Sequence, residues 1–376
     1  MKALVVSHSY VVGVNQKKLE LLAATPNLSL ALAVPRVWAD MGQQIPLQKS
    51  QDPRYRIYGL DVCWHRHLYA HFYSPLELWR VLSRERPDMV YIEEEPQSFA
   101  ALQTVGLAKA AGCRTVLLTW ENLLRKFPLY KRALQQMVFH NLDGVIGGTG
   151  EALETARSLG FTGPGFVNPQ FGVDEEEFRP KDVASLRGSL GLSEQFVIGF
   201  IARLLREKGI LTLIEAAAKL EHDFRLLVVG KGPIENEARR QADRAGIRDK
   251  VVWAGIIPHI LLSDYMNLMD VFVLPSIPAR DWKEQFGHVV IEAMACRVPV
   301  VGSDCGAIPE LMGEGGLVFP AGEHVALADC LRKLHADRAL RINLGNKGRQ
   351  RAIREYSNAT VANRLVGFLR AVAGDT

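Results

Sequence analysis

Short apolar runs alternate along the chain with longer segments that have the spacing of amphipathic helices. In the first half, the apolar runs are 2–8, 28–35, 88–93 and 114–120, and two helix candidates are 75–87 and 96–112. Strands that are apolar throughout and alternate with helices are typical of a parallel sheet that is buried on both faces. The pattern therefore predicts a doubly wound α/β domain in the N-terminal half.

The same alternation restarts after residue 180. Its apolar runs are 196–204, 224–232, 251–257, 271–276 and 298–304, and its first helix candidate is 210–220. Pro169, Gly172 and Pro180 punctuate an acidic stretch at 168–181, which suits a solvated connector. Near the end of the chain, 356–373 has the spacing of an amphipathic helix. We therefore predict two doubly wound domains instead of one.

The carboxyl ends of the strands are the expected place for ligands. In open parallel sheets, ligands bind in the crevice beyond those ends. Two such domains that face each other through these ends would enclose a deep cleft with room for two substrates. The predicted fold class is therefore α/β, with two Rossmann-like doubly wound domains facing across a cleft.

Composition and charge exclude several classes of protein. Of the 376 residues, 48% are hydrophobic and 23% are charged, which is ordinary for a globular protein. A net charge of +4 is too small to indicate nucleic-acid binding. The five cysteines have the spacing of neither a zinc site nor a disulfide framework, so we expect buried thiols in a reducing compartment. With no signal-peptide pattern and no run near the ~18 apolar residues of a membrane span, we expect a cytoplasmic protein.

One basic cluster in the first half has aromatic and aliphatic neighbours. Arg125, Lys126, Lys131 and Arg132 flank the apolar residues of 127–130. Such a cluster is either a solvated helix face or a peripheral contact with the anionic inner face of a membrane. Both interpretations stay open at this stage.

The second half offers a candidate site for a diphosphate. An apolar run ends at Ile201, and Arg203 and Lys208 follow in the loop that leads through Gly209 into a helix. A diphosphate needs fixed positive charges together with backbone N–H groups at the start of a helix. The alternative is a solvated basic loop, because Arg206 lies beside the pair.

Two glutamates further along could bind hydroxyl groups. Glu284 precedes a helix that begins near His288, and Glu292 lies early in that helix. A carboxylate suits a ribose diol or the hydroxyls of a sugar, because it accepts two hydrogen bonds. The backbone N–H groups of Phe286, Gly287 and His288 would point along the helix axis at an anion. Two glutamates at this spacing are common by chance, so the spacing alone carries little weight.

Two glycine-bearing segments differ in what they indicate. Gly13 lies in the loop after the first apolar run, where its backbone could approach a phosphate or a sugar, or simply form a tight turn. The segment 144–152 has four glycines but does not match G-x-G-x-x-G with an acidic residue ~20 positions on, so we assign it no dinucleotide.

Three histidines, His65, His67 and His71, lie among aromatic residues. Metal ligation would need a cysteine or carboxylate to complete the cluster, and the sequence nearby offers none. We therefore expect no metal here and favour a surface lined with aromatic rings for a sugar acceptor, with His65 and His67 as candidates.

The segment 284–312, EQFGHVVIEAMACRVPVVGSDCGAIPELM, resembles the donor-site motif of family 4 retaining glycosyltransferases, which have the GT-B fold. Three further segments follow the family's order. FGVDEEEFRP (171–180) is similar to its interdomain segment, GFIARLLREKGI (199–210) to its phosphate-binding loop, and LLVVGKGP (226–233) to its V-G-x-G-P strand end. The resemblance covers about residues 165–350.

The resemblance implies a role for each matching residue. Arg203 and Lys208 would neutralise the departing diphosphate, Glu292 would hold the ribose, and Glu284 would hold hydroxyls of the donor sugar. The other implied donor contacts are the backbone at Gly13, Gly230, Gly232, Phe286, Gly287 and His288. The implied catalytic residues are Arg203, Lys208 and Glu284.

The resemblance also implies a division of the chain. Residues 1–170 would bind the acceptor, completed by the last helix at 357–376, and residues 171–356 would bind the donor. Many relatives have a histidine near the donor sugar in the first domain, but the matching strand end here is followed by Glu121 and Asn122, which become acceptor-side candidates. Arg297 and Ala307 also stand where the family usually has glycine.

The implied activity is a retaining transfer of a hexose from a nucleotide diphosphate sugar to a lipid-linked glycan, a lipid or a small acceptor. A UDP-sugar is favoured as donor and GDP-mannose is the alternative. No metal and no cofactor would be needed, because the leaving diphosphate accepts the proton of the acceptor. The other interpretations are a sugar-nucleotide epimerase on the same scaffold and a catalytically silent protein that binds sugar nucleotides.

Overall fold

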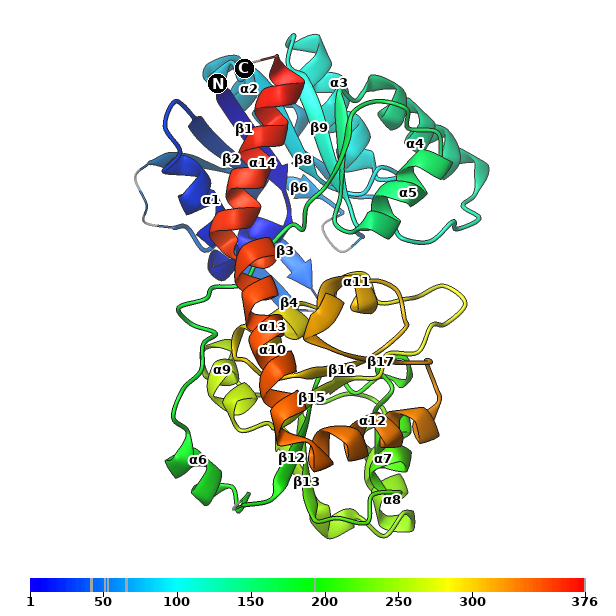
Figure 1. Ribbon diagram of the computed structural model, residues 1–376. Helices are drawn as coiled ribbons and strands as arrows, with labels where there is room; N and C mark the ends of the chain where they lie inside the picture. Colours follow the sequence, from blue (N-terminus) through cyan, green and yellow to red (C-terminus); the bar gives the residue numbers. More distant parts are fainter. Residues whose placement is uncertain (41–42, 51, 53, 65–66, 193, 375–376) are drawn as a thin grey trace. The chain divides into compact units, whose positions relative to one another are not determined.

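The computed structural model describes residues 1–376 except 41–42, 51, 53, 65–66, 193 and 375–376 (Figure 1). It divides into two compact units. The first contains Met1–Gly172 and Asn358–Thr376, and the second contains Val173–Ser357. The sequence predicts a division after residue 170 and before residue 357.

The N-terminal unit is built on a seven-stranded parallel sheet with the order β11-β10-β9-β8-β1-β2-β5. Its strands are β1 (Lys2–Ser7), β2 (Ser29–Pro35), β5 (Tyr55–Leu60), β8 (Met89–Glu93), β9 (Arg114–Thr119), β10 (Gly144–Gly147) and β11 (Gly165–Val167). Successive side chains of a strand point to opposite faces of the sheet. Leu4 and Val6 of β1 therefore join one core, and Ala3 and Val5 join the other.

Helices cover both faces of this sheet. They are α1 (Lys17–Ala23), α2 (Pro75–Glu85), α3 (Phe99–Ala110), α4 (Leu129–Asn141), α5 (Gly150–Ser158) and α14 (Asn358–Ala373). The core that holds Leu4 also takes residues of α2 and α3, and the core that holds Val5 takes residues of α1 and α14. The last helix, red in Figure 1, therefore completes the N-terminal unit.

Two short antiparallel hairpins were not expected from the sequence. They are β3 (Val37–Asp40) with β4 (Gln43–Pro46), and β6 (Val62–Cys63) with β7 (Phe72–Tyr73). Their strands have four and two residues, which is too short to give a clear period-two pattern. Two 3-10 turns, η1 (Ser9–Val11) and η2 (Gly13–Gln16), follow β1 directly.

The C-terminal unit has a six-stranded parallel sheet with the order β14-β13-β12-β15-β16-β17. Its strands are β12 (Phe196–Ile201), β13 (Phe224–Val229), β14 (Val251–Gly255), β15 (Val271–Leu274), β16 (Val300–Ser303) and β17 (Gly316–Phe319). Its helices are α6 (Ala184–Ser189), α7 (Ile210–Ala217), α8 (Glu235–Arg244), α9 (His259–Asn267), α10 (His288–Ala295), α11 (Ile308–Met312), α12 (His324–Ala336) and α13 (Arg338–Tyr356), with 3-10 turns η3 (Arg206–Lys208), η4 (Arg248–Lys250) and η5 (Gly313–Gly315).

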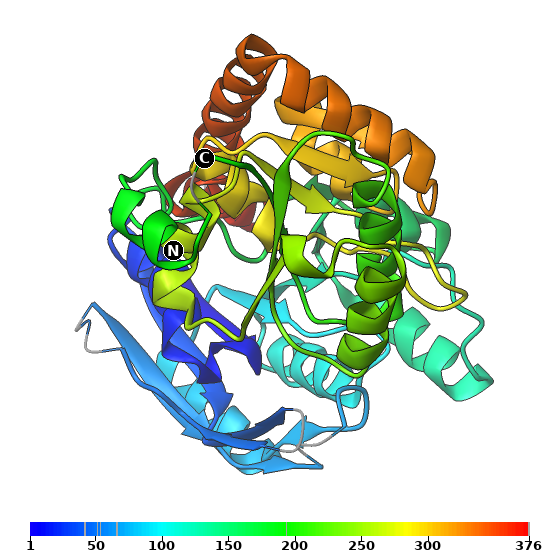
Figure 2. The same ribbon diagram turned by 90° about the horizontal axis from the view of Figure 1, so that it is seen from below.

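Helices also cover both faces of the second sheet. α7, α8 and α12 share one core with Ile198 and Phe200 of β12, and Figure 2 shows α7 and α8 in green and α12 in orange. On the other face, α10 packs against α9, α11 and α13. Two Rossmann-like doubly wound units are thus present, which confirms the predicted fold class for each unit.

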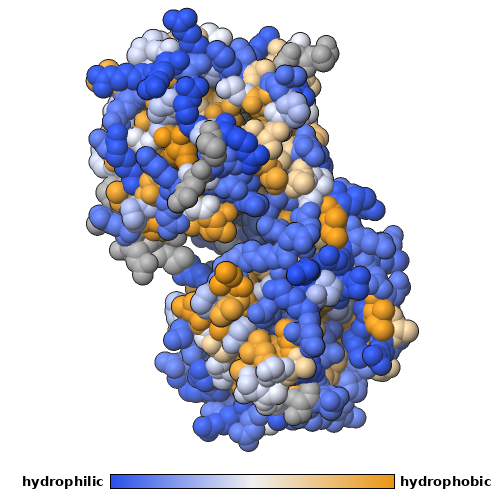
Figure 3. All heavy atoms as spheres, turned by 90° about the vertical axis from the view of Figure 1, so that its left-hand side faces the viewer, coloured by the Kyte–Doolittle hydropathy of each residue, from blue (hydrophilic) through white to orange (hydrophobic). Residues whose placement is uncertain are grey.

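The described part of the chain contains no helix that is both long and apolar enough to cross a membrane. On the face that Figure 3 shows, apolar side chains gather in small, separate groups within a mostly hydrophilic surface.

Candidate functional site

Backbone segments approach each other closely where β12 and β13 end. A Cβ atom built on Gly230 would lie 2.0 Å from the carbonyl oxygen of Ala202, and one built on Gly232 would lie 2.3 Å from that of Leu204. Gly230 also has a φ of +128°, a backbone angle that residues other than glycine rarely adopt. Both glycines therefore have a packing reason that is independent of any ligand.

The loop after β12 is fixed against the end of β15. Gly209 has a φ of +73°, and a Cβ atom there would lie 1.8 Å from the carbonyl oxygen of Pro275. The backbone N–H of Ile277 donates to the carbonyl of Glu207 over 2.8 Å. These contacts position Lys208, whose side chain is 21% exposed, at the carboxyl end of the sheet.

Lys208 contacts the first of the two predicted glutamates. Its Nζ lies 2.7 Å from Oε2 of Glu284 and 4.8 Å from the centre of the Trp282 ring. The hydroxyl of Ser276 donates to the same carboxylate oxygen over 2.8 Å. The structure thus brings the predicted cation and carboxylate together from two loops that are 76 residues apart.

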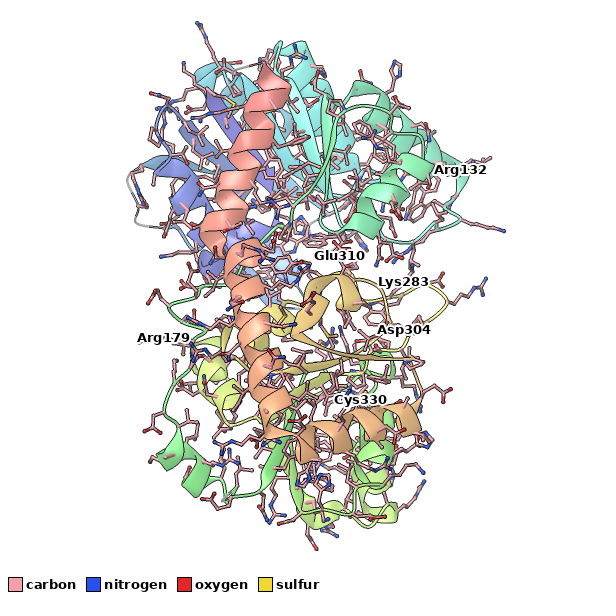
Figure 4. The ribbon with its side chains drawn as sticks, in the orientation of Figure 1. Arg132, Arg179, Lys283, Asp304, Glu310 and Cys330 are labelled. Carbon is pink, nitrogen blue, oxygen red and sulfur yellow. The ribbon has the colours of Figure 1, made fainter. Side chains whose placement is uncertain are left out.

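The backbone of Glu284 is also held. The N–H of Ala307 donates to its carbonyl over 3.1 Å, and Gly306 packs so closely that a Cβ atom would lie 2.1 Å from that carbonyl oxygen. Gly306 and Ala307 belong to the loop after β16, where Asp304 is labelled in Figure 4, and Lys283 is labelled in the loop before α10. Three strand ends therefore converge on Glu284.

The helix predicted after Glu284 begins at His288, as expected from the sequence. Gly287 is the N-cap of α10 with a φ of +79°, and a Cβ atom there would lie 3.5 Å from Cγ of Glu284. The rings of Phe286 and His288 flank it with centres 4.7 Å apart. Helix N-termini favour anions, so this end of α10 beside Lys208 suits a phosphate.

Glu292 lies in the same helix but has another partner. Its Oε1 is 3.4 Å from Nε2 of His259, the first residue of α9, and Glu177 lies 3.4 Å from the other nitrogen of that ring. The hydrogen bond to Glu292 raises the pKa of His259, and burial opposes this effect. Arg203 is exposed in the loop after β12, with no side-chain hydrogen bond or ion pair to any residue that the structure describes.

The first loop of the N-terminal unit holds Gly13 in a turn. The N–H of Gly13 donates to Oε1 of Gln48 over 2.8 Å, so this group is already occupied. The residue before it, Val12, has an extended backbone, and Gly13 begins the turn η2. The structure therefore supports the turn interpretation of Gly13 more directly than a phosphate contact.

The acceptor-side candidates lie at the end of β9 and in the turn before β7. Glu121 and Asn122 are 4% and 2% exposed, so both face the interior. Burial raises the pKa of Glu121, although the Arg125 guanidinium lies 3.2 Å away. Nδ2 of Asn122 donates to Glu151 over 3.2 Å. Both side chains are thus held within the unit.

Of the two histidine candidates, His65 falls outside the residues that the structure describes. His67 is exposed and lines a hollow of about 320 Å³ together with Tyr69, Tyr130 and Lys131. Nζ of Lys131 lies 4.5 Å from the centre of the Tyr69 ring. A surface with aromatic rings is therefore present beside His67.

The structure corrects the expectation that no carboxylate completes a cluster around these histidines. Glu94, which follows β8, has Oε2 3.4 Å from Nε2 of His71 and 2.8 Å from Nδ1 of His8. Burial favours the neutral carboxyl, but the two imidazoles outweigh it and hold the pKa of Glu94 below its usual range. No pattern near His71 in the sequence indicates this cluster, because His8 and Glu94 lie on distant segments of the chain.

The neighbours of Glu94 are also carboxylates, of which Glu93 is buried and Glu95 is partly buried. Glu93 pairs with Nζ of Lys18 over 2.7 Å, and both side chains are at most 1% exposed. Burial raises the pKa of Glu95 to about 7, against a hydrogen bond from Thr119. A run of three glutamates directly after an apolar strand was the signal in the sequence that could have indicated this site.

The basic cluster divides in the structure. Arg125 pairs with Glu121, and Lys131 lies over Tyr69. Lys126 and Arg132 are exposed, and Figure 4 shows Arg132 on α4 at the outside of the N-terminal unit. Only part of the predicted cluster is therefore directed outward.

Comparisons with known proteins agree with the geometry of the C-terminal unit. Residues 182–351 match the model of the family "Glycosyl transferases group 1". The chain is 28% identical over 206 residues to alpha-D-kanosaminyltransferase of Streptomyces kanamyceticus, covering 52% of this chain and 52% of that protein. It is 31% identical over 208 residues to a GDP-mannose-dependent phosphatidylinositol monomannoside mannosyltransferase of Mycobacterium tuberculosis, covering 53% and 54%. The match thus spans about half the length of these relatives.

Solved structures extend the likeness to the whole chain. Sucrose-phosphate synthase of Thermosynechococcus elongatus superposes with a TM-score of 0.75 at 20% identity, and both chains are covered completely. Anabaena HepE in complex with UDP gives a TM-score of 0.77 at 19% identity, covering 99% of this chain and 100% of that one. At such identities the likeness establishes the fold. The chain therefore has the GT-B fold, and residues 182–351 within it match the family model of the glycosyl transferases group 1.

Proposed function

We propose that the chain is a glycosyltransferase that moves a hexose from a nucleotide diphosphate sugar to an acceptor hydroxyl with retention of configuration. The observation that carries this proposal is the contact of Lys208 with Glu284 beside the N-terminus of α10. A fixed cation and a helix start suit a diphosphate, and an adjacent carboxylate suits sugar hydroxyls. The match of residues 182–351 to the glycosyl transferases group 1 model supports the same assignment.

In this proposal, Lys208 stabilises the charge that develops on the departing diphosphate. The acceptor oxygen forms a bond to the anomeric carbon, and the bond from that carbon to the diphosphate breaks. The electron pair leaves with the diphosphate, whose oxygen takes the proton of the acceptor. Positive groups aimed at developing charge are usually the largest catalytic contribution in such sites. Arg203, exposed in the same loop, is proposed to close on the diphosphate when the donor binds.

The two glutamates divide the rest of the donor in this proposal. Glu284 binds hydroxyls of the sugar, and its present bonds to Lys208 and Ser276 hold the carboxylate in place. Glu292 binds the ribose, and its present partner is His259. The backbone of Phe286, Gly287 and His288, together with Gly230 and Gly232, lines the same strand ends.

A UDP-hexose is the favoured donor, and GDP-mannose is the second candidate. The structure of HepE, which shares the fold, was solved with UDP and also with UDP-glucose. The name of the mycobacterial relative specifies GDP-mannose. Sugar nucleotides of both bases therefore belong in the first experiment.

The first experiment is a thermal-shift panel of UDP, GDP and ADP sugars, followed by transfer of a radiolabelled sugar into a lipid extract or a glycan mixture. A bound nucleotide sugar stabilises the folded state by mass action. Transfer supports the proposal. An isomerised donor would identify an epimerase, and stabilisation with an unchanged donor would identify a silent binding protein. No stabilisation by any sugar nucleotide would contradict all three.

The acceptor is proposed to be a lipid-linked glycan, a lipid or a small hydroxylated molecule, bound by the N-terminal unit. Glu121, Asn122 and the aromatic surface beside His67 are its candidate contacts. A cluster of exposed apolar side chains on α4 supports an acceptor that lies in a membrane. Leu129, Tyr130 and Met137 are 80%, 58% and 54% exposed.

We propose that this face of α4 makes peripheral contact with the anionic inner face of the membrane. Lys126 and Arg132 provide charge next to the apolar side chains, and each basic residue near such a surface contributes about 1 kcal/mol. Cosedimentation with vesicles of phosphatidylglycerol and phosphatidylcholine tests this. Reversing both charges with Lys126→Glu and Arg132→Glu should weaken binding at least ~10-fold.

The matched control for this experiment is the pair Arg240→Glu and Arg244→Glu, two exposed arginines of α8 in the other unit. It makes the same change in net charge and should leave binding to vesicles unchanged. Equal loss in both pairs would mean that net charge alone governs binding and that α4 is not the contact.

A further inference from the structure

Three potential metal ligands from distant segments meet at the carboxyl edge of the N-terminal sheet. His8 follows β1, His71 precedes β7 and Glu94 follows β8. Nδ1 of His8, Nε2 of His71 and a carboxylate oxygen of Glu94 all lie within 4.8 Å of one another. Two imidazoles and one carboxylate are the ligand set of many zinc sites.

The surroundings aim these atoms at a common point. Nδ1 of His71 lies 2.9 Å from the carbonyl oxygen of Leu68, so it carries the proton and leaves a lone pair on Nε2. The backbone N–H of His8 and the hydroxyl of Tyr73 donate to Oε1 of Glu94 over 3.0 and 2.7 Å, which leaves Oε2 toward the two rings. Such outer contacts fix the orientation of ligands in metal sites.

One of these atoms is buried without a hydrogen bond in the described part of the chain, although Oε2 of Glu94 lies 3.4 Å from it. The side chain of His71 is 0% exposed, and its Nε2 makes no hydrogen bond with any residue that the structure describes. A buried polar atom without a partner costs free energy, so such an atom calls for an explanation. An ion that accepts its lone pair would supply one.

We infer that His8, His71 and Glu94 form a three-ligand site for a divalent transition metal such as Zn²⁺, with one position open to water. Ligands at tetrahedral zinc lie about 3.4 Å from one another, given metal–ligand distances of about 2.1 Å. Nε2 of His71 and Oε2 of Glu94 already have that separation, 3.4 Å. His8 and Glu94 are a hydrogen-bond distance apart, 2.8 Å, so the ion displaces the proton between them.

The site is buried but reachable. The side chain of Glu94 is 0% exposed and that of His8 is 19% exposed, so an ion enters from the side of His8. The ring of Trp38 lies 4.6 Å from that of His8 and 4.8 Å from that of His71, and it forms an apolar wall. The proposed donor residues, apart from Gly13, belong to the other unit.

The test is a metal titration of the full chain after treatment with a chelator. Zn²⁺ is titrated against a competing chromophoric indicator, and Co²⁺ is used as a spectroscopic probe. We expect one Zn²⁺ per chain, a visible d–d band with Co²⁺, and a rise of the unfolding temperature with Zn²⁺. His8→Ala and Glu94→Gln should each weaken Zn²⁺ binding at least ~10-fold, because even changes outside the ligand set cost 10-fold to 100-fold.

The matched control is His67→Ala, an exposed histidine four residues before His71, which should bind Zn²⁺ like the wild type. Circular dichroism of the metal-free variants shows whether they fold. If His8→Ala does not fold, Glu94→Gln still tests the site, because it keeps the shape of the side chain. A wild type that binds no Zn²⁺ would overturn the inference and leave a network held by protons alone. Equal Zn²⁺ binding by the wild type and both ligand variants would overturn it as well.

Discussion

The carboxyl edges of the two sheets carry polar side chains in contrasting ways. At the C-terminal sheet, loops with Gly209, Gly230 and Gly306 pack backbone against backbone and leave Lys208 and the start of α10 at the edge. At the N-terminal sheet, carboxylates follow β8 and are buried against cations and aromatic rings. The first arrangement suits an anion with many oxygens, and the second suits hydroxyl groups or a metal ion. The same fold thus provides two different chemical environments.

The largest effect is expected at Lys208. Lys208→Ala removes the positive charge that contacts Glu284, and turnover should fall ~10²-fold or more, as when one transition-state stabiliser is lost. Steady-state kinetics with the donor found in the thermal-shift panel measure this. Arg206→Ala is the control, because Arg206 lies in the same turn but pairs with Glu237 on the surface. Turnover of Lys208→Ala within twofold of the wild type would remove Lys208 from the mechanism.

The packing of the loops differs between the edges, and alanine substitutions should expose that difference. Gly209→Ala combines a positive φ with a Cβ atom 1.8 Å from the carbonyl oxygen of Pro275, so we expect a loss of about 3 kcal/mol in unfolding free energy. A Cβ atom at Gly13 would meet Gln48, with its Oε1 nearest at 3.3 Å, so Gly13→Ala should cost about 1 kcal/mol or less. Urea unfolding followed by tryptophan fluorescence measures both. Equal losses would mean that the two loops are equally tight.

A smaller effect concerns pH at the donor edge. Glu292 raises the pKa of His259, so protonated His259 stabilises the folded state fully below pH 6.5, and this contribution is lost as pH rises through the raised pKa. Since half of this side chain is exposed, the contribution is small. The same deprotonation releases Glu292, so donor affinity should rise a few-fold above pH 6.5. His259→Ala should bind the donor with no such step, and a step that persists in the variant would exclude His259 as its source.

The smallest expected effect is that of chelation on donor binding. The side chains of Lys208 and Arg203 supply the positive charge of the proposed donor site. A UDP or GDP sugar should therefore raise the unfolding temperature equally with and without a chelator. If chelation abolishes the stabilisation and manganese restores it, the donor site needs a metal and the comparison between the two edges fails.

The sequence predicted the C-terminal edge better than the N-terminal one, and the reason is physical. Lys208 and Glu284 each lie in a segment that also contains glycines and an apolar run. The position of each side chain at a strand end could therefore be predicted from that segment alone. Glu94 is held by His8 and by Tyr73 of the two-residue strand β7, which is too short to leave a periodic pattern. Contacts of this kind depend on which distant loops meet, and no local pattern encodes that.

Local signals also explain the exact ends of several helices. The helix predicted at 96–112 begins as α3 at Phe99, because the Ser98 side chain accepts a hydrogen bond from the N–H of Ala101. The helix predicted at 356–373 is preceded by a break, since Ser357 has an extended backbone between α13 and α14. The break falls where the chain passes from the second unit back into the first.

We propose above all that the C-terminal unit holds a sugar diphosphate at the edge where Lys208 and Glu284 meet. A crystal structure of the chain with a bound nucleotide sugar tests it most directly. We predict that the phosphates contact Lys208 and Arg203, that Glu284 reaches the sugar and that Glu292 reaches the ribose. A nucleotide bound elsewhere, or one whose phosphates contact neither Lys208 nor Arg203, would contradict the account.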